Sequence, residues 1–197
     1  VGIVAVVLFV AFVQYRNFLR KSKNYERSLK MVHLHIHLPP SSTDIESGSN
    51  RDQRDLTDEI LSQAQIMYSI ISSTAFSGLK AKFFGQRHLS FEIVAKDGLI
   101  YYYTVVPMAL VDVVRQAIST AYPSARMEEV KGTNIFQDSS TYDSICGGEL
   151  TLKKDSVYPI LTYQESKQDV SRSILNALSA AKQGDGVAIQ ILIRPAD

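Results

Sequence analysis

Three histidines alternate with apolar residues in a short segment: His33, His35 and His37. In a β-strand this alternation sends all three imidazoles to one face, with neighbouring histidines about 6–7 Å apart at Cα. Two such histidines could share a metal ion, but a site needs further ligands. The only other histidine is His88, and no motif places an Asp or Glu nearby. We therefore expect a solvated strand face, with metal binding as the open alternative.

Nucleotide and nucleophilic chemistry have no support in the sequence. The phosphate-binding pattern G-x-x-x-x-G-K-[ST] is absent. Gly184 and Gly186 precede a predicted strand instead of a helix, so we interpret them as a helix cap and a turn. Cys146 has no predicted helix N-terminus or nearby histidine to activate its thiol. We expect no catalytic residue and no cofactor in this chain.

Three consecutive tyrosines, Tyr101, Tyr102 and Tyr103, raise the question of nucleic-acid binding. Aromatic strand residues stack on bases in some RNA-binding α+β domains. This run lacks the basic residues that accompany such a surface, and alternate residues of a strand face the core. The whole chain has 21 Lys+Arg against 20 Asp+Glu, a formal net charge of +1. We therefore predict no direct contact with nucleic acid.

The sequence begins with an apolar run, residues 1–13, that contains no polar side chain. A buried core helix would show polar residues at helical spacing. A signal-peptide core would be preceded by positive charge and followed by small residues at a cleavage site. We predict a transmembrane helix over residues 1–19, truncated at its N-terminus, because about 20 apolar residues are needed to cross the hydrocarbon core.

Basic residues follow the apolar run: Arg16, Arg20, Lys21 and Lys23. By the positive-inside rule they place the rest of the chain in the cytoplasm, as a single-pass protein of the inner (cytoplasmic) membrane. A nucleic-acid patch is the alternative, but contact with anionic lipid headgroups is simpler beside a membrane span. We interpret residues 20–30 as a basic juxtamembrane linker. The single cysteine of the chain suits a reducing compartment.

Residues 31–197 carry the pattern of one α+β domain, with a mobile polar loop over 40–54. Their order is β-α-β-β-α-β followed by a further β-α-β, which predicts a ferredoxin-like sandwich extended by one unit. Hydrophobic periodicity predicts strands over 31–38, 89–96, 99–106, 126–131, 149–153, 157–162 and 187–194, and helices over 55–73, 107–121 and 169–184.

Two blocks of sequence are similar to a known family. The first is LIYYYTVVP at 99–107, continued by QAI at 116–118 and AYPSA at 121–125. The second is YPILTY at 158–163, continued by ALS at 177–179 and AIQILIRP at 188–195. Both resemble the N-terminal membrane-proximal region of conjugative-transfer ATPases of the type IV secretion system, the TraG- and VirB-like class.

This resemblance implies a bacterial, non-catalytic domain that anchors a larger ATPase in the inner membrane. It also implies protein-protein interaction with other secretion-system subunits and a homo-oligomer formed through the parent ATPase. The motor of that family lies C-terminal to the resembling region, so no nucleotide-binding residue is carried over. The alternative is a stand-alone membrane-anchored ligand-binding or sensor domain, and continuation of the reading frame into a P-loop would separate the two.

Overall fold

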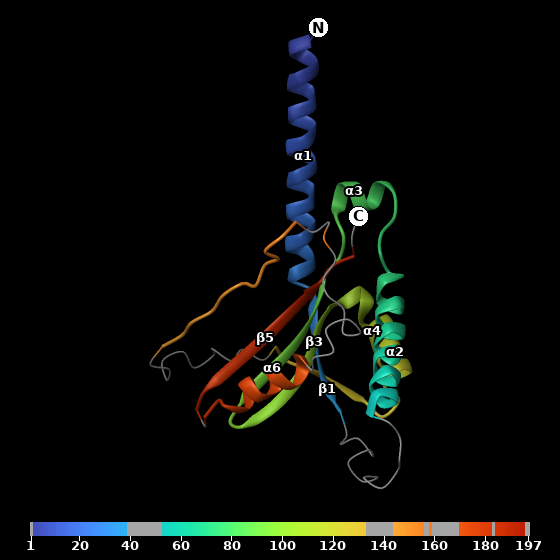
Figure 1. Ribbon diagram of the computed structural model, residues 1–197. Helices are drawn as coiled ribbons and strands as arrows, with labels where there is room; N and C mark the ends of the chain where they lie inside the picture. Colours follow the sequence, from blue (N-terminus) through green and yellow to red (C-terminus); the bar gives the residue numbers. More distant parts are fainter. Residues whose placement is uncertain are drawn as a thin grey trace. The chain divides into compact units, whose positions relative to one another are not determined.

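A long helix, α1 (Gly2–Ser28), leads through a short turn into strand β1 (Met31–His37) (Figure 1). The computed structural model describes residues 2–38, 53–132, 144–155, 158, 170–182 and 184–195. The remaining elements are α2 (Gln53–Ser72), α3 (Leu79–Phe84), β2 (Leu89–Lys96), β3 (Leu99–Pro107), the 3₁₀ turn η2 (Met108–Leu110), α4 (Val111–Ala121), β4 (Arg126–Val130), α6 (Val170–Ser179) and β5 (Gly186–Ile193).

The strands form one sheet in the order β4-β1-β3-β2-β5. Strand β1 pairs antiparallel with both of its neighbours, with Leu34 opposite Thr104 on β3 and Glu129 on β4. The side chain of Gln190 on β5 donates a 2.7 Å hydrogen bond to Glu92 on β2. The described residues divide into two compact units; the larger contains α1, β1, α2, α3, α4 and β4, and the smaller contains the β2–β3 turn, residues 144–155 and α6.

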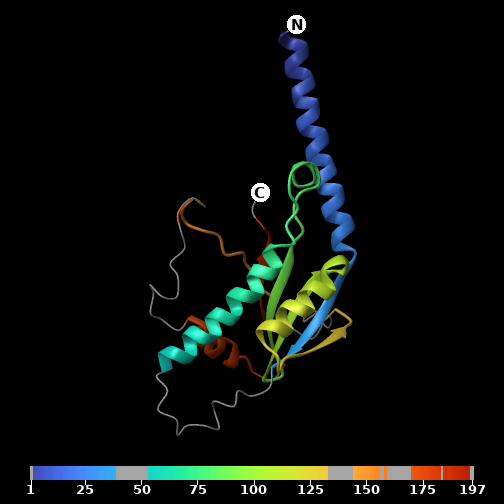
Figure 2. The ribbon, with the colours of Figure 1, turned by 90° about the vertical axis from the view of Figure 1, so that its right-hand side faces the viewer.

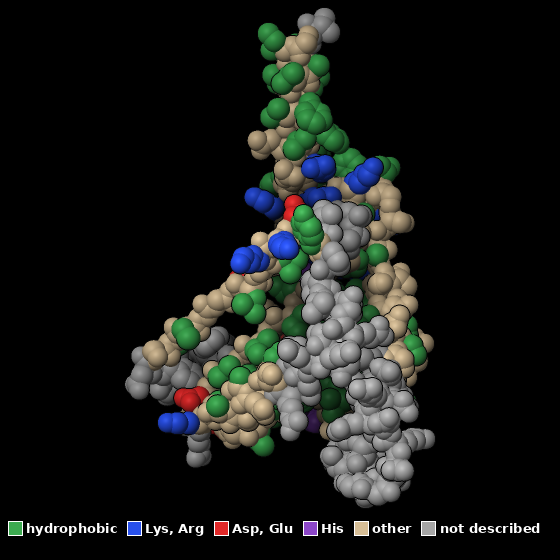
Figure 3. Space-filling view, in the orientation of Figure 1, with side chains coloured by type: hydrophobic (Ala, Val, Ile, Leu, Met, Phe, Trp, Pro, Cys, Tyr) green, Lys and Arg blue, Asp and Glu red, His purple; other side chains and the backbone are tan. Residues whose placement is uncertain are grey.

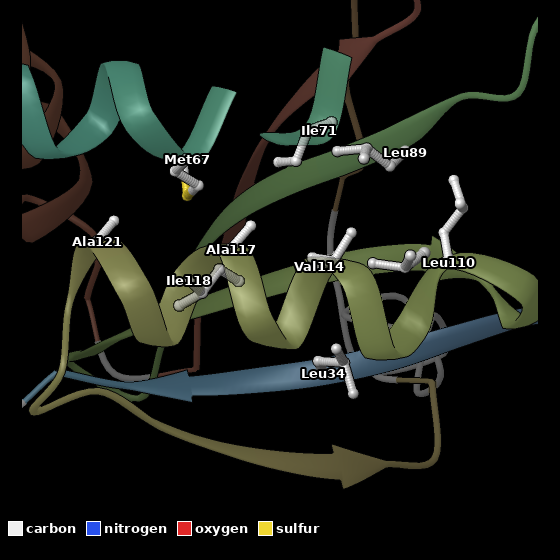
Figure 4. Packing of buried hydrophobic residues seen from close by; sticks show 10 residues of the cluster. Leu34, Met67, Ile71, Leu89, Leu110, Val114, Ala117, Ile118 and Ala121 are labelled. Atoms are coloured by element: carbon white, nitrogen blue, oxygen red, sulfur yellow. The ribbon is translucent and has the colours of Figure 1, made fainter. Parts of the chain in front are cut away.

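The hydrophobic core of the larger unit lies between the sheet and two helices. Helices α2 and α4 lie side by side on one face of the strands (Figure 2). One side chain of β1 packs in this core against residues of α2 and α4. The apolar residues of each helix recur at helical spacing and therefore lie on one face of it. Figure 4 shows this cluster, which includes Leu34, Met67, Ile71, Val114, Ala117, Ile118 and Ala121.

One polar side chain is fully buried beside this core, on the central strand β3. The Thr104 hydroxyl is 0% exposed and donates a 2.9 Å hydrogen bond to the Ser90 carbonyl oxygen on β2. This bond offsets the cost of removing the hydroxyl from water, which an unpaired group would bear in full.

The structure confirms the β-hairpin over β2 and β3. Its turn is Asp97-Gly98, and both residues have positive φ, 52° and 76°. A two-residue turn with two positive φ values matches the right-handed twist of the strands, which is why Asp-Gly is a strong hairpin signal. The strand from Met31, the helix ending at Ala121 and the last strand are also confirmed, although Pro107 ends β3 instead of opening the helix.

Three expectations about the elements need correction. The predicted strand over 149–153 is absent: residues 149–152 lie in no strand, and Leu150 is fully exposed. Alternation alone gave that prediction, but a strand also needs a neighbour for its hydrogen bonds. Helix α6 ends at Ser179, before Gly184. The region interpreted as a basic juxtamembrane linker, residues 20–30, is helical as far as Ser28, the last residue of α1. Helix α2 begins at Gln53, not at Asp55.

Two other expectations lie outside the described residues. These are the polar loop over 40–54, apart from its last two positions, and the strand over 157–162, of which only position 158 is described.

Candidate functional site at the junction of α1 and α3

Helix α1 has two chemically different halves. Residues 2–13 are apolar, all of them up to residue 12 are exposed, and no residue of the whole helix is buried. From Arg16 onward the helix carries basic side chains. Figure 3 shows Lys and Arg gathered around the lower half of the helix, while its outer half carries hydrophobic side chains. Among the described residues, α1 is the helix long and apolar enough to cross a membrane.

The chain between α2 and β2 makes an excursion that contains α3, and we name residues 76–86 the α3 loop. Its two ends are joined by the buried side chain of Gln86. The Phe76 N–H donates to Gln86 Oε1, and Gln86 Nε2 donates to the Phe76 carbonyl oxygen, both at 2.8 Å. Gly78 and Gly85 bracket α3 with φ of 64° and 65°, a left-handed conformation that favours glycine. The loop is therefore closed by hydrogen bonds at its base.

Two arginines of α1 hold the α3 loop through its backbone. Arg20 donates to the carbonyl oxygens of Lys82 (3.0 Å) and Ala81 (3.3 Å). Arg27 donates through Nη1 to three consecutive carbonyl oxygens, those of residues 84, 85 and 86, at 3.1–3.3 Å. These carbonyls include groups at the C-terminal end of α3, where a helix leaves acceptors unpaired and favours positive charge.

Aromatic contacts add to this junction. The rings of Phe12 on α1 and Phe83 on α3 meet edge to face, with centroids 5.9 Å apart. The guanidinium of Arg87 lies 4.3 Å from the centroid of the Phe76 ring, and that of Arg27 lies 5.5 Å from it. Burial, and then the nearby charge of Arg87, lowers the pKa of Arg27. The α3 loop is therefore bound to α1 along both the apolar and the basic part of the helix.

A groove of about 430 Å³ lies beside the basic end of α1, and four of its nine lining residues are Lys or Arg. Glu26 is the single carboxylate in its wall, and it pairs with two lysines, Lys23 and Lys30. The other lining residues are Arg27, Phe76, Arg87, Pro107, Met108 and Ala109. Such an excess of positive charge attracts anionic groups.

The structure places the four predicted headgroup contacts in different surroundings. Arg20 binds the α3 backbone, and Lys23 pairs with Glu26. Lys21 is exposed. The Nε atom of Arg16 is buried and has no hydrogen-bond partner among the described residues. Arg16, Arg20 and Lys23 share one half-buried face of α1, whereas Lys21 projects from another.

The histidine strand β1 lies between β4 and β3 in the sheet, and alternation places its three imidazoles on the face opposite Leu34. The rings of His35 and His37 have centroids 3.9 Å apart, and His35 lies 4.8 Å from Tyr103. His37 Nε2 lies 3.6 Å from a Glu128 carboxylate oxygen. Burial, and then His37, lowers the pKa of His35 despite an opposing effect of Glu128. In the part of the chain that the structure describes, no group of three His, Cys, Asp or Glu side chains could hold a metal.

The other singled-out residues are separate from the junction. Tyr103 is buried, while Tyr101 and Tyr102 are half-buried, so the three tyrosines do not form one exposed stacking surface. Cys146 is exposed. Gly184 has a φ of 92° in the turn before β5, where Asp185 Oδ2 accepts a 2.9 Å hydrogen bond from the Lys182 N–H.

Sequence reasoning missed the residues that build the junction: Phe76, Gln86 and Arg87, and the role of Arg27. One signal was available, because LKAKFF between Gly78 and Gly85 combines lysines with large apolar residues. The contacts themselves join residues about sixty positions apart, such as Arg20 and Lys82. No local periodicity reports such a separation.

Replacing Gln86 with Ala is expected to open the base of the α3 loop. The substitution removes both hydrogen bonds to Phe76, and the local cost is about 1–3 kcal/mol because each is worth about 0.5–1.5 kcal/mol. Hydrogen exchange should accelerate at the amides of 76–86 and stay unchanged in β1. Gln116→Ala, at an exposed position of α4, is the matched control. Equal exchange in the two variants would show that Gln86 does not close the loop.

Comparison with known proteins gives a family and little else. Neither curated proteins nor solved structures yield a match to this chain. One family model, described as a domain of unknown function (DUF8128), matches residues 53–197 and so covers the region from α2 to the last residue. The chain therefore belongs to the DUF8128 family, whose function is unknown.

Proposed function

We propose that this chain is a non-catalytic domain that anchors a larger protein to the inner membrane and contributes to its assembly. In this proposal α1 crosses the bilayer once and the α+β domain faces the cytoplasm. The observation that carries the proposal is the two-part character of α1. Apart from the contact of Phe12 with Phe83, the side chains of its apolar half are exposed up to residue 12, a pattern that a helix in water does not sustain. Its basic half is bound to the folded domain through Arg20 and Arg27.

The charge around the junction supports the cytoplasmic orientation. Arg27, Arg87, Lys23 and Lys30 surround a groove next to the predicted span. Cationic residues within about 15–20 residues of a span favour the cytoplasmic side, and those near the membrane surface are attracted to anionic headgroups. In this proposal Arg16, Arg20, Lys21 and Lys23 occupy the headgroup layer, with Arg20 also holding the α3 loop.

For the fold, we propose a ferredoxin-like arrangement. The chain order β1-α2-β2-β3-α4-β4 supports it, as does the placement of α2 and α4 on one face of the sheet. Strand β5 and α6 would be the additional unit. Exposed apolar side chains on the outermost strand β5, at Val187, Ile191 and Leu192, support a role in protein-protein contact.

We further propose that the parent protein is a type IV secretion or conjugation ATPase. In this proposal the domain helps the ATPase to form a homo-oligomer and to contact other secretion-system subunits. Its support is the resemblance of residues 99–125 and 158–195 to the membrane-proximal region of those ATPases. The alternative, a stand-alone ligand-binding or sensor domain, has less support, because the described grooves are open and the most charged one adjoins the membrane helix.

The test is the mass of the native gene product isolated from membranes, with its C-terminal peptides sequenced. A much longer product that contains a P-loop is the expected result. A product that ends near position 197 would contradict the secretion-ATPase proposal, although it would leave membrane anchoring by α1 intact.

A further inference from the structure

The α3 loop lies beside α1 at the border between its apolar and basic halves (Figures 1 and 2). Two contacts define the position of the loop along the α1 axis. Phe83 meets Phe12, within the apolar run, and Arg20 binds the carbonyl oxygens of residues 81 and 82. The loop therefore extends along α1 from the basic residues back toward the apolar ones.

The rise per residue of an α-helix gives the depth in the bilayer at which the α3 loop contacts α1. Phe12 precedes Arg16 by four residues, or about 6 Å along the axis, and precedes Arg20 by eight, or about 12 Å. The headgroup layer of one leaflet is roughly 5–8 Å thick, from the difference between total and hydrocarbon thickness. If Arg16 and Arg20 lie among headgroups, a ring in contact with Phe12 reaches the level of the acyl chains.

The exposed surface of α3 has the composition of a segment that lies at the boundary between lipid headgroups and acyl chains. Leu79 is 72% exposed and Phe84 is 37% exposed, although both are large apolar side chains. Lys80 and Lys82 are exposed between them. Apolar residues that enter the acyl boundary, combined with lysines whose charged ends extend to headgroups, are typical of segments that lie in a membrane interface.

We propose that the α3 loop inserts into the interface of the same bilayer that α1 crosses and forms a second lipid contact of the domain. Leu79, Phe83 and Phe84 enter the acyl boundary, and Lys80 and Lys82 lie on anionic headgroups. This inference rests on the proposed function, because it requires α1 to span the membrane. Since Gln86 closes the loop and Arg27 binds it to α1, two separated membrane contacts set the rotation of the domain about α1, which a single helix would leave free.

The absence of tryptophan from the sequence permits a direct depth measurement. A single Trp is introduced at one position of the full chain, which is reconstituted into phosphatidylcholine–phosphatidylglycerol vesicles with or without brominated acyl chains. Bromine quenches only a Trp that reaches the acyl region. The test variant is Leu79→Trp, with Phe84→Trp as a second site on the same loop. The matched negative control is Leu38→Trp, which is 50% exposed and follows the end of β1 remote from α1.

Phe9→Trp reports on α1 itself and separates the two proposals. The expected result is loss of emission in brominated vesicles for Phe9→Trp, Leu79→Trp and Phe84→Trp, with none for Leu38→Trp. Loss for Phe9→Trp without loss at either loop position would overturn this inference and leave the anchor in place. No loss for Phe9→Trp would overturn the anchor and, with it, the second contact. Equal loss for Leu38→Trp would also overturn the inference, because it would show that lipid contact is not specific to the loop.

Discussion

Arginine in place of both Val6 and Val10 is expected to release the protein from membranes. Both valines lie on the apolar half of α1, where Val6 is 63% exposed and Val10 is 50% exposed. An arginine at the centre of a membrane helix costs about 2.5–3.5 kcal/mol on the insertion scale, so two cost about 5–7 kcal/mol. The measurement is the fraction of protein that stays in the membrane pellet after alkaline carbonate extraction, which should fall by more than an order of magnitude.

The matched control adds the same two charges to the other half of the helix. Tyr25 and Leu29 are each 69% exposed and lie at or just beyond the basic end of α1. The variant with Arg at both positions should remain in the pellet like the unaltered protein, because arginines there lie outside the hydrocarbon core. If the Val6 and Val10 variant also remains in the pellet, α1 does not hold the protein in the membrane.

Replacing Leu34 with Ala is expected to cause a large loss of domain stability. Leu34 is 0% exposed on a central strand and belongs to the cluster that α4 and α2 cover. Truncating a fully buried leucine removes its transfer free energy and leaves a cavity, which together cost about 2–5 kcal/mol. Urea unfolding of the detergent-solubilised protein, followed by circular dichroism, should show a lower midpoint with an unchanged slope.

Leu38→Ala provides the control for that substitution. The same truncation is made four residues later, where the side chain is half exposed, and surface changes of this kind usually stay within about 0.5 kcal/mol. Equal midpoints for the two variants would mean that Leu34 is not buried between β1 and the two helices and that the register between β1 and β3 is wrong.

The elements that sequence predicted well are those with a strong local signal. The Asp97-Gly98 turn between two apolar strands needs only its own residues to form, and the structure has it. Strand β1 alternates so regularly that the opposite placement of Leu34 and the three histidines followed directly. Helix α4 carries a clear apolar stripe ending at Ala121, and its end was also predicted correctly.

The elements that sequence missed depend on distant partners. Helix α3 has six residues, too few for a helical period to appear, and is held by Arg20 and Arg27 from a different part of the chain. The segment around Leu150 shows the opposite error, because alternating residues predicted a strand that has no neighbour among the described strands. A local sequence pattern indicates which residues favour a helix or a strand. Whether the element forms also depends on its pairing with another strand or its packing against a distant part of the chain.

The candidate site was anticipated only in its chemistry. The basic residues after the apolar run were visible in the sequence, so a contact with anionic lipid was a natural prediction. The different contacts of these residues were not predictable, because Arg20 and Lys23 have similar neighbours in the sequence. In the structure Arg20 donates to backbone carbonyls of the α3 loop, while Lys23 pairs with Glu26 on its own helix.

The most direct test of a cytoplasmic domain on a single-pass anchor uses the one cysteine of the chain, Cys146, which is exposed. The unaltered chain is expressed in bacteria, and a membrane-impermeant maleimide is applied to spheroplasts and to inside-out inner-membrane vesicles. A single-pass anchor with a cytoplasmic domain predicts labelling in the inside-out vesicles and none in spheroplasts until they are lysed. Labelling of intact spheroplasts would contradict the cytoplasmic orientation of the domain, and recovery of the protein in the soluble fraction would contradict anchoring by α1.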